Sequence, residues 1–253
     1  MHQFICNWIH DLSNICDHVI LSSNLAIDDV CYFSKNKSEE GASIYNSNKN
    51  KFVFTSCIFE DNDSQGAGIY NKESILDLEK CNFNNNVSSQ NGTALYNNNG
   101  VLNLKKCIFN SNRAVWGKCG GAISSFYGTI NIENCNFKRN EARNGGVIDN
   151  YNGKVYINSS NFDENNSEWK GGSLLNRERG YFNVSNCNFN NNNAKTATDI
   201  YNLAGEIELF RCVFKNNEKS IIINKDCITL KECELADYHE IFDFENATTN
   251  IMP

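Results

Sequence analysis

The feature that most constrains the fold of this 253-residue chain is an internal repeat with a period of about 25 residues. Cysteines recur at that spacing along most of the chain, with a serine in one copy. This cysteine column consists of Cys31, Cys57, Cys81, Cys107, Cys135, Ser160, Cys187, Cys212 and Cys233. A fixed period of this length indicates stacked structural units, so the repeat decides the architecture before any single residue is considered.

Two further columns keep the same register. A phenylalanine stands two residues after each of the first eight members of the cysteine column, and an asparagine follows three residues later. The phenylalanine column is Phe33, Phe59, Phe83, Phe109, Phe137, Phe162, Phe189 and Phe214. The asparagine column is Asn36, Asn62, Asn86, Asn112, Asn140, Asn165, Asn192 and Asn217. FxxN thus occurs eight times in one register, which composition alone would not produce even among 45 asparagines.

Each unit carries short strands. Alternating apolar pairs such as Leu76-x-Leu78 and Ile130-x-Ile132 precede the cysteines, with the period of two that a strand with one buried face shows. After FxxN and a short polar turn comes a second strand, in the segments GASIYN, GAGIYN, GTALYN, GGAISS, GGVIDN, GGSLLN and ATDIYN. It supplies a second asparagine column: Asn46, Asn71, Asn97, Asn150, Asn176 and Asn202, with Ser125 substituting once.

A unit this thin cannot bury its own apolar face, whereas stacked units bury it in a continuous interior. A coil of this length divides into about three faces, and coils stack at about 4.8 Å, the spacing of neighbouring strands. The sequence therefore predicts an all-β fold, a parallel β-helix of about eight to nine coils. We expect the right-handed form, because strand–crossover–strand connections between parallel strands are overwhelmingly of that hand.

The chain is expected to form one domain with different ends. Residues 1–24 are predicted to be an N-terminal cap, residues 25–235 the β-helix, and residues 236–253 a C-terminal cap or tail, because the repeat is lost there. The cap should contain a short amphipathic helix, since apolar residues recur at helical spacing from Trp8 to Val19.

The stacked columns have predicted structural roles. The phenylalanines should fill the interior. The asparagines should tolerate left-handed backbone in turns and pass amide hydrogen bonds from coil to coil. The cysteines should behave as small hydrophobes with free thiols, because in-register neighbours have parallel Cβ vectors that do not converge on a disulfide. Cys6, Cys16, Cys119 and Cys227 lie outside the column and are the ones that could be exposed or paired. No metal site and no cofactor is expected.

Five aromatic residues are candidate binding residues. Strand alternation directs Tyr45, Tyr70 and Tyr96 outward on successive coils, which predicts a tyrosine ladder that could stack on sugar rings or only stabilise an exposed sheet. Trp116 and Trp169 lie in the longer turns between FxxN and the following glycine pair, where they could form a contact surface or cover the core.

Charge and hydropathy exclude some functions. With 23 basic against 30 acidic side chains the net charge is -7, the wrong sign for a protein that binds nucleic acid by neutralising phosphates. No apolar run approaches the roughly 20 residues of a membrane-spanning helix. The N-terminus lacks a basic region and an unbroken apolar segment, so we see no secretion signal.

The repeated motifs resemble a known family. FxxN together with Gly120-Gly121-Ala122-Ile123, Gly145-Gly146-Val147-Ile148 and Gly171-Gly172-Ser173-Leu174 is similar to the GGAI and FxxN repeats of polymorphic outer-membrane proteins and adhesin-like proteins. The similarity runs from about Cys31 to Asn217. It implies a right-handed parallel β-helix at the cell surface that is not an enzyme and binds glycans or cell-surface proteins. The chain departs from that family in having no visible signal peptide, translocating barrel or anchor.

Two other functions are consistent with the sequence. The missing signal and the reduced thiols also fit a cytoplasmic protein-interaction scaffold. Parallel β-helices also include pectate-lyase-like enzymes, whose chemistry needs carboxylates, calcium or an Arg or Lys base clustered on one face of neighbouring coils. We find no such cluster in the sequence: Asp149 is the acidic residue on the outward column of the second strand, and Asp199 lies two coils later.

Overall fold

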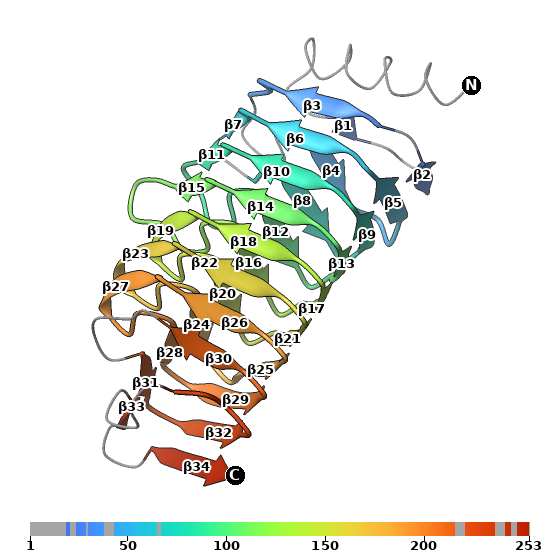
Figure 1. Ribbon diagram of the computed structural model, residues 1–253. Helices are drawn as coiled ribbons and strands as arrows, with labels where there is room; N and C mark the ends of the chain where they lie inside the picture. Colours follow the sequence, from blue (N-terminus) through green and yellow to red (C-terminus); the bar gives the residue numbers. More distant parts are fainter. Residues whose placement is uncertain are drawn as a thin grey trace.

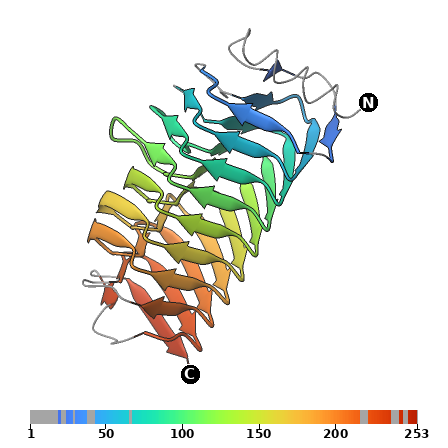
Figure 2. The same ribbon diagram turned by 45° about the horizontal axis from the view of Figure 1, so that its top comes forward.

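The computed structural model describes residues 19–20, 24–28, 30–37, 43–64, 67–215, 221–235, 241–243 and 247–252. Every regular element in these ranges is a β-strand, and the strands pair in parallel with their equivalents on the neighbouring coils. Figures 1 and 2 show the coils stacked along one axis, with β3 near one end and β34 at the other. The predicted all-β parallel β-helix is confirmed, while the expected capping helix lies outside the described residues.

Four sheets run along the stack. Sheet A, with the second asparagine column, contains β1 (Val19–Ile20), β4 (Ile44–Asn46), β8 (Ile69–Lys72), β12 (Leu95–Asn98), β16 (Ile123–Phe126), β20 (Ile148–Tyr151), β24 (Leu174–Arg177), β28 (Ile200–Asn202), β31 (Ile222–Asn224) and β33 (Ile241–Asp243). Sheet B, before the cysteines, contains β2 (Leu25–Ile27), β5 (Lys51–Thr55), β9 (Ile75–Glu79), β13 (Val101–Lys105), β17 (Thr129–Glu133), β21 (Lys154–Asn158), β25 (Gly180–Ser185), β29 (Gly205–Phe210), β32 (Cys227–Lys231) and β34 (Thr248–Met252).

The other two sheets follow the cysteine in each coil. Sheet C, with the phenylalanine column, contains β3 (Tyr32–Ser34), β6 (Ile58–Glu60), β10 (Asn82–Asn84), β14 (Ile108–Asn110), β18 (Asn136–Lys138), β22 (Asn161–Asp163), β26 (Asn188–Asn190) and β30 (Val213–Lys215). Sheet D, after FxxN, contains β7 (Asp63–Ser64), β11 (Val87–Ser88), β15 (Arg113–Ala114), β19 (Glu141–Asn144), β23 (Asn166–Lys170) and β27 (Asn193–Thr196). One turn of the chain separates neighbouring strands in a sheet, so the eight strands of sheet C span seven complete turns.

The stack continues beyond sheet C at both ends. β1 pairs with β4 and β2 with β5 at one end, and β33 pairs with β31 and β34 with β32 at the other. Two strands from the stretch expected to form a C-terminal cap or tail therefore add to sheets A and B.

Two corners of each coil are made by single residues in the left-handed region. Those between sheets B and C have φ of 51° to 59°, and those between sheets C and D have φ of 52° to 57°. The first group is Ser56, Lys80, Lys106, Asn134, Ser159, Asn186, Arg211 and Glu232; the second is Lys35, Asp61, Asn85, Ser111, Arg139, Glu164 and Asn191. Each immediately precedes a member of the cysteine or asparagine column. The left-handed role expected of the column asparagines therefore belongs to the residue before each of them.

The phenylalanine column fills the interior as a continuous stack. All eight rings are buried, and consecutive centroids lie 4.6 to 5.0 Å apart with interplanar angles of 3° to 13°. Phe59, Phe83, Phe109, Phe137, Phe162 and Phe189 each have a neighbour on both sides. Strict register makes this possible, because Phe83 pairs with Phe59 on one strand and with Phe109 on the next.

The predicted asparagine ladders are confirmed. In the FxxN column each Nδ2 donates to the Oδ1 of the next coil over 2.9 to 3.1 Å, through Asn36, Asn62, Asn86, Asn112, Asn140, Asn165 and Asn192. The amide of Asn112 also donates to the carbonyl of Phe83 on the preceding coil. Each buried amide therefore joins three coils, which satisfies polar groups that would be costly to bury alone.

The cysteines of the column are buried except for Cys233, which is half-buried, and all but Cys31 are thiols that form no disulfide. Cys57, Cys81, Cys107, Cys135, Cys187 and Cys212 are buried and form no disulfide. Their sulfurs bond along the stack: Cys107 Sγ donates to the carbonyl of Leu78, and the Cys107 amide donates to Cys135 Sγ. Cys31 corrects the prediction of free thiols throughout the column, because it is disulfide-bonded.

Candidate groove on sheet B

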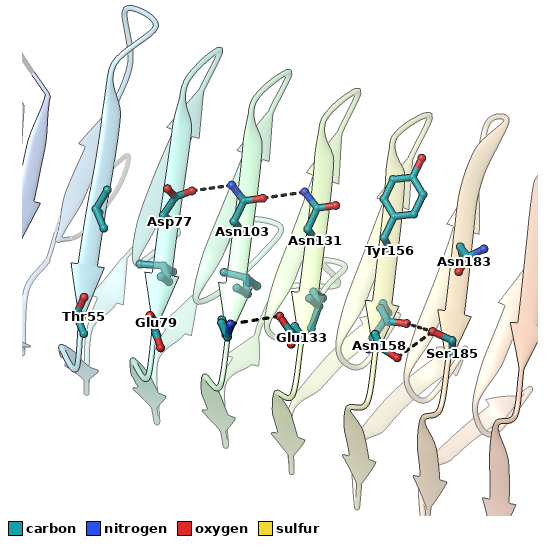
Figure 3. A pocket seen from close by; sticks show the side chains of 16 residues that line it. Thr55, Asp77, Glu79, Asn103, Asn131, Glu133, Tyr156, Asn158, Asn183 and Ser185 are labelled. Carbon is teal, nitrogen blue, oxygen red and sulfur yellow. Dashed lines mark hydrogen bonds and ion pairs between the residues drawn. The ribbon is translucent and has the colours of Figure 1, made fainter.

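The outward side chains of sheet B line a surface groove of about 630 Å³ that crosses the coils from β5 to β25 (Figure 3). Strand alternation produces it: Leu78, Leu104, Ile132 and Ile157 point into the core, and their neighbours point outward. The outward lining residues are Val53, Thr55, Asp77, Glu79, Asn103, Lys105, Asn131, Glu133, Tyr156, Asn158, Asn183 and Ser185. The groove therefore presents polar side chains repeated along the stack.

A chain of hydrogen bonds fixes the central row of the groove. Asn103 donates from Nδ2 to Asp77 over 2.6 Å, and Asn131 donates to Asn103 Oδ1 over 2.8 Å (Figure 3). Lys51 closes the row with an ion pair to the second oxygen of Asp77 at 2.8 Å. Each side-chain amide donates one N–H to its neighbour and keeps a second N–H, so the row offers both donors and acceptors to a ligand.

An aromatic side chain continues this row. Tyr156 is 39% exposed, and its ring meets that of Tyr181 edge to face with centroids 5.8 Å apart. The hydroxyl of Tyr181 donates to Glu208 over 2.5 Å, and Asn183 donates to the same carboxylate oxygen over 2.8 Å. Burial and the bond to Glu208 raise the pKa of Tyr181, so it remains a neutral phenol. Tyr156 is thus an exposed ring held by ordered neighbours.

A second row in the groove carries charge. Glu79, Lys105 and Glu133 occupy equivalent positions on successive coils, and Lys105 lies 3.7 Å from Glu133. Together with Asp77, these residues place three carboxylates and an ammonium on one face of neighbouring coils. Asp149 and Asp199, the acidic residues named from the second strand, are not part of this row. The charged residues of the groove stand in the sequence between the two apolar residues of a pair, as Asp77 does, and directly after the pair, as Glu79 does.

The predicted tyrosine ladder exists on sheet A. The rings of Tyr45 and Tyr70 stack at 5.0 Å and 13°, and those of Tyr70 and Tyr96 lie 5.0 Å apart at 37°. All three are half-buried. Tyr45 also borders a surface depression of about 520 Å³ with Lys49, Lys72 and Glu73 among its lining. The ring faces contact one another, so the ladder offers ring edges rather than open faces.

The outer face of sheet A is covered beyond this ladder. A β-carbon added at Gly145, whose φ is +60°, would lie 3.1 Å from the Cβ of Leu175, so the glycine turn passes directly over the sheet. Tyr201, which is in register with Leu175 on the next coil, is buried with Leu175, Ala197 and Ile223.

The two candidate acidic residues of the second strand are also buried. Asp149 accepts hydrogen bonds from Arg177, and Asp199 accepts one from Asn192 over 2.8 Å. Burial raises the pKa of Asp149, and the charge of Arg177 opposes that shift. Both carboxylates therefore stabilise the coil packing. Asp149 lies on the outer face of sheet A, as expected, but it is buried there.

The two tryptophans lie beside sheet D. Trp116 follows β15 and is 85% exposed, and Trp169 lies in β23 and is 43% exposed. The structure does not bring them into the groove of sheet B, whose lining contains neither residue.

Within the part of the chain that the structure describes, no three His, Cys, Asp or Glu side chains gather in a way that could hold a metal ion. In the same ranges no helix combines the length and the hydrophobicity that a membrane span requires. Comparisons of the chain with protein-family models, with curated proteins and with solved structures found no match.

Proposed function

We propose that this chain is a non-catalytic, adhesin-like surface protein that binds host or cell-surface glycans along the groove of sheet B. The observation that carries the proposal is the combination in one groove of an ordered amide row and the exposed ring of Tyr156. The similarity of its GGAI and FxxN motifs to polymorphic outer-membrane protein repeats supports the same class.

The chemistry of the groove suits a sugar chain. Sugar hydroxyls both donate and accept hydrogen bonds, and asparagine amides do the same. Because Asn103, Asn131 and Tyr156 lie in register on successive strands, they repeat at about 4.8 Å along the stack. A linear glycan lying along the axis would meet equivalent groups on each coil, with the ring of Tyr156 as a hydrophobic platform.

Surface display has one further support. Cys31 is disulfide-bonded, and disulfides persist mainly in oxidising compartments. The six buried thiols of the column are compatible with such a compartment, because the core shields them from oxidants. Protease treatment of intact source cells tests this part of the proposal: trimming from outside supports it, whereas full protection would favour the cytoplasmic scaffold.

Binding is tested with a panel of immobilised neutral and acidic oligosaccharides and the full chain. Tyr156→Ala should weaken binding of the best ligand about tenfold or more, the equivalent of about 1.4 kcal/mol. Tyr32→Ala is the matched control, because Tyr32 is 54% exposed but lies on sheet C. Equal binding by wild type and Tyr156→Ala would exclude the groove as the glycan site.

The charged row of the groove favours a second candidate, a polysaccharide lyase or hydrolase. Lys105 and Glu133 are the pair that could exchange a proton with a bound sugar. Incubation with acidic polysaccharides, followed by detection of unsaturated or newly reducing sugar ends, tests it. If the wild type cleaves a polysaccharide and Lys105→Met does not, the function of this groove is catalysis rather than binding.

A further inference from the structure

A second surface, formed by the loop after β15 and by strands β19, β23 and β27, combines tryptophan with basic side chains. A β-bulge shapes it: the pairing of β23 with β27 shifts register between Ser167 and Lys170. Ser167 fixes the bulge, because its one hydroxyl hydrogen is shared between the carbonyls of Arg143 and Lys170 and its oxygen accepts from the Trp169 amide. Bulges redirect side chains, and this one leaves Trp169 43% exposed.

Two cations from neighbouring coils approach the Trp169 ring. Lys195 on the following coil lies over it at 4.2 Å, and Arg143 on the preceding coil lies 6.0 Å from its centroid. Cation–π contacts of this kind stabilise by about 0.5–1 kcal/mol at exposed sites. The ring therefore holds two long side chains in place, about two coil spacings, or roughly 10 Å, apart.

Trp116 adds an open ring beside this pair. Its side chain is 85% exposed although its φ is 60°, a conformation that bulky residues rarely adopt. The adjacent Gly117 lies against the Arg143 side chain, since a β-carbon added there would be 3.2 Å from a guanidinium nitrogen.

The local charge is opposite to that of the whole chain. The net charge of the protein is -7. Across β15, the loop after it, β19, β23 and β27, however, basic residues outnumber acidic ones: Arg113, Lys118, Arg143, Lys170 and Lys195 stand against Glu141 and Glu168. A basic patch on an acidic protein selects ligands by local charge complementarity rather than by overall attraction.

We propose that Trp116, Arg143, Trp169 and Lys195 form a second binding site, specific for an acidic polysaccharide. Arg143 and Lys195 bind carboxylate or sulfate groups on the polymer, and Trp116 packs against a sugar face between or beside them. Only the choice of a sugar polymer rests on the function proposed above. The site itself rests on the bulge, the two cation–π contacts and the exposure of Trp116.

The experiment measures binding of the full chain to a sulfated oligosaccharide, a uronic-acid oligosaccharide and a neutral glucan, at several salt concentrations. Arg143→Gln and Lys195→Gln should each weaken binding of the acidic ligands about tenfold and flatten the salt dependence. Trp116→Ala should weaken binding with little change in salt dependence. Lys106→Gln is the control, because it removes an exposed cation at the corner between sheets B and C, away from sheet D. It should leave the affinity for every ligand unchanged. Preference for the sulfated or for the uronic-acid ligand identifies the anionic group.

Two results would overturn the site. One is unchanged acidic-ligand binding in the Arg143→Gln, Lys195→Gln double variant, with an unfolding midpoint equal to that of wild type. The other is tighter binding to anionic phosphatidylglycerol vesicles or to DNA than to either acidic oligosaccharide. Tyr156→Ala distinguishes this site from the groove. If only Tyr156→Ala loses binding of the neutral glycan, that binding occurs in the groove. If only the charge variants lose binding of the acidic ligands, that binding occurs at the second site.

Discussion

Arg177 donates from Nε and Nη2 to the two carboxylate oxygens of Asp149 on the preceding coil, over 2.8 and 2.5 Å. Asp149 is fully buried, and the guanidinium also lies over the ring of Tyr151 at 5.3 Å. Replacing Arg177 by Gln would leave a buried carboxylate without its counter-charge. We expect a loss of about 3–5 kcal/mol in the free energy of unfolding near neutral pH.

The loss should depend on pH. Burial already raises the pKa of Asp149, and removal of Arg177 raises it further. A carboxyl whose pKa is higher in the folded than in the unfolded state takes up a proton on folding, so stability falls as pH rises through the folded pKa. Arg177→Gln should therefore recover part of its stability in mild acid. The double variant Asp149→Asn, Arg177→Gln is the control, because it carries no buried charge at this position. If the stability of both variants changed with pH in the same way, the Asp149 carboxyl would not be the group that titrates.

Ser125→Asn should stabilise the protein by about 1–2 kcal/mol. Ser125 interrupts the second asparagine ladder, and both its own hydroxyl and Asn150 Oδ1 are buried without a hydrogen-bond partner. Its register partners are Asn97 and Asn150, so an asparagine side chain matches the column on both sides. Denaturant unfolding measures the gain. The reverse change at an intact position, Asn71→Ser, should lower the free energy of unfolding by a similar amount. If both variants had the same unfolding midpoint as the wild type, continuity of the ladder would not be a source of stability.

Phe109→Ala should destabilise the protein by about 3–5 kcal/mol, because it removes a buried ring that stacks on Phe83 and Phe137. The neighbouring coils should be disturbed first, since each coil contacts only its neighbours. Hydrogen exchange would show this as faster exchange in β10 and β18 than in distant strands. Phe210→Ala, on the partly exposed outer face of sheet B, should cost much less. An unchanged midpoint for Phe109→Ala would contradict the interior column.

Alkylation of the native protein should spare the six buried thiols of the cysteine column, from Cys57 to Cys212. Hydrogen bonds with Cys135 and Cys81, together with burial, raise the pKa of Cys107, and a hydrogen bond with Cys187 helps to raise that of Cys212 to about 12. Hydrogen bonds with Cys107 and Cys57 instead lower the pKa of Cys81 to about 4, but this thiol is equally buried. Because reagent cannot reach any of the buried sulfurs, iodoacetamide should label them only after unfolding. Among the described cysteines, Cys119, Cys227 and Cys233 are partly exposed and should react first. Peptide mapping by mass spectrometry provides the measurement, and rapid native labelling of Cys107 would argue against a closed core.

The sequence predicted the interior of the fold well because interior positions repeat. Phe83 and Asn86 recur with the same side chain on coil after coil, because parallel ring stacking and the amide ladder both need the same group on the next coil. The groove was missed for the opposite reason. Its central row reads Asp77, Asn103, Asn131 in one column, and these residues share polarity rather than identity.

The fate of Asp149 could not be predicted from strand alternation. Alternation correctly sends it to the outer face of sheet A, but it says nothing of what packs over that face. The turn through Gly145 passes over this face at Leu175, one coil further on, and Arg177 from that coil supplies the counter-charge. Coverage by a turn depends on the three-dimensional course of the chain, which a one-dimensional pattern does not contain.

The in-register backbone hydrogen bonds between coils, such as that from the Asn82 amide to the Cys57 carbonyl at 2.9 Å, all run along the stack. A mechanical load applied between β2 and β34, at opposite ends of the molecule in Figure 1, would meet them coil by coil rather than all at once. Each coil that detached would release about 80–90 Å of chain, at roughly 3.3–3.6 Å for each of about 25 residues. Under tension the protein would therefore lengthen in even steps and dissipate work at each one, behaving as an extensible tether rather than as a rigid rod that fails in a single event.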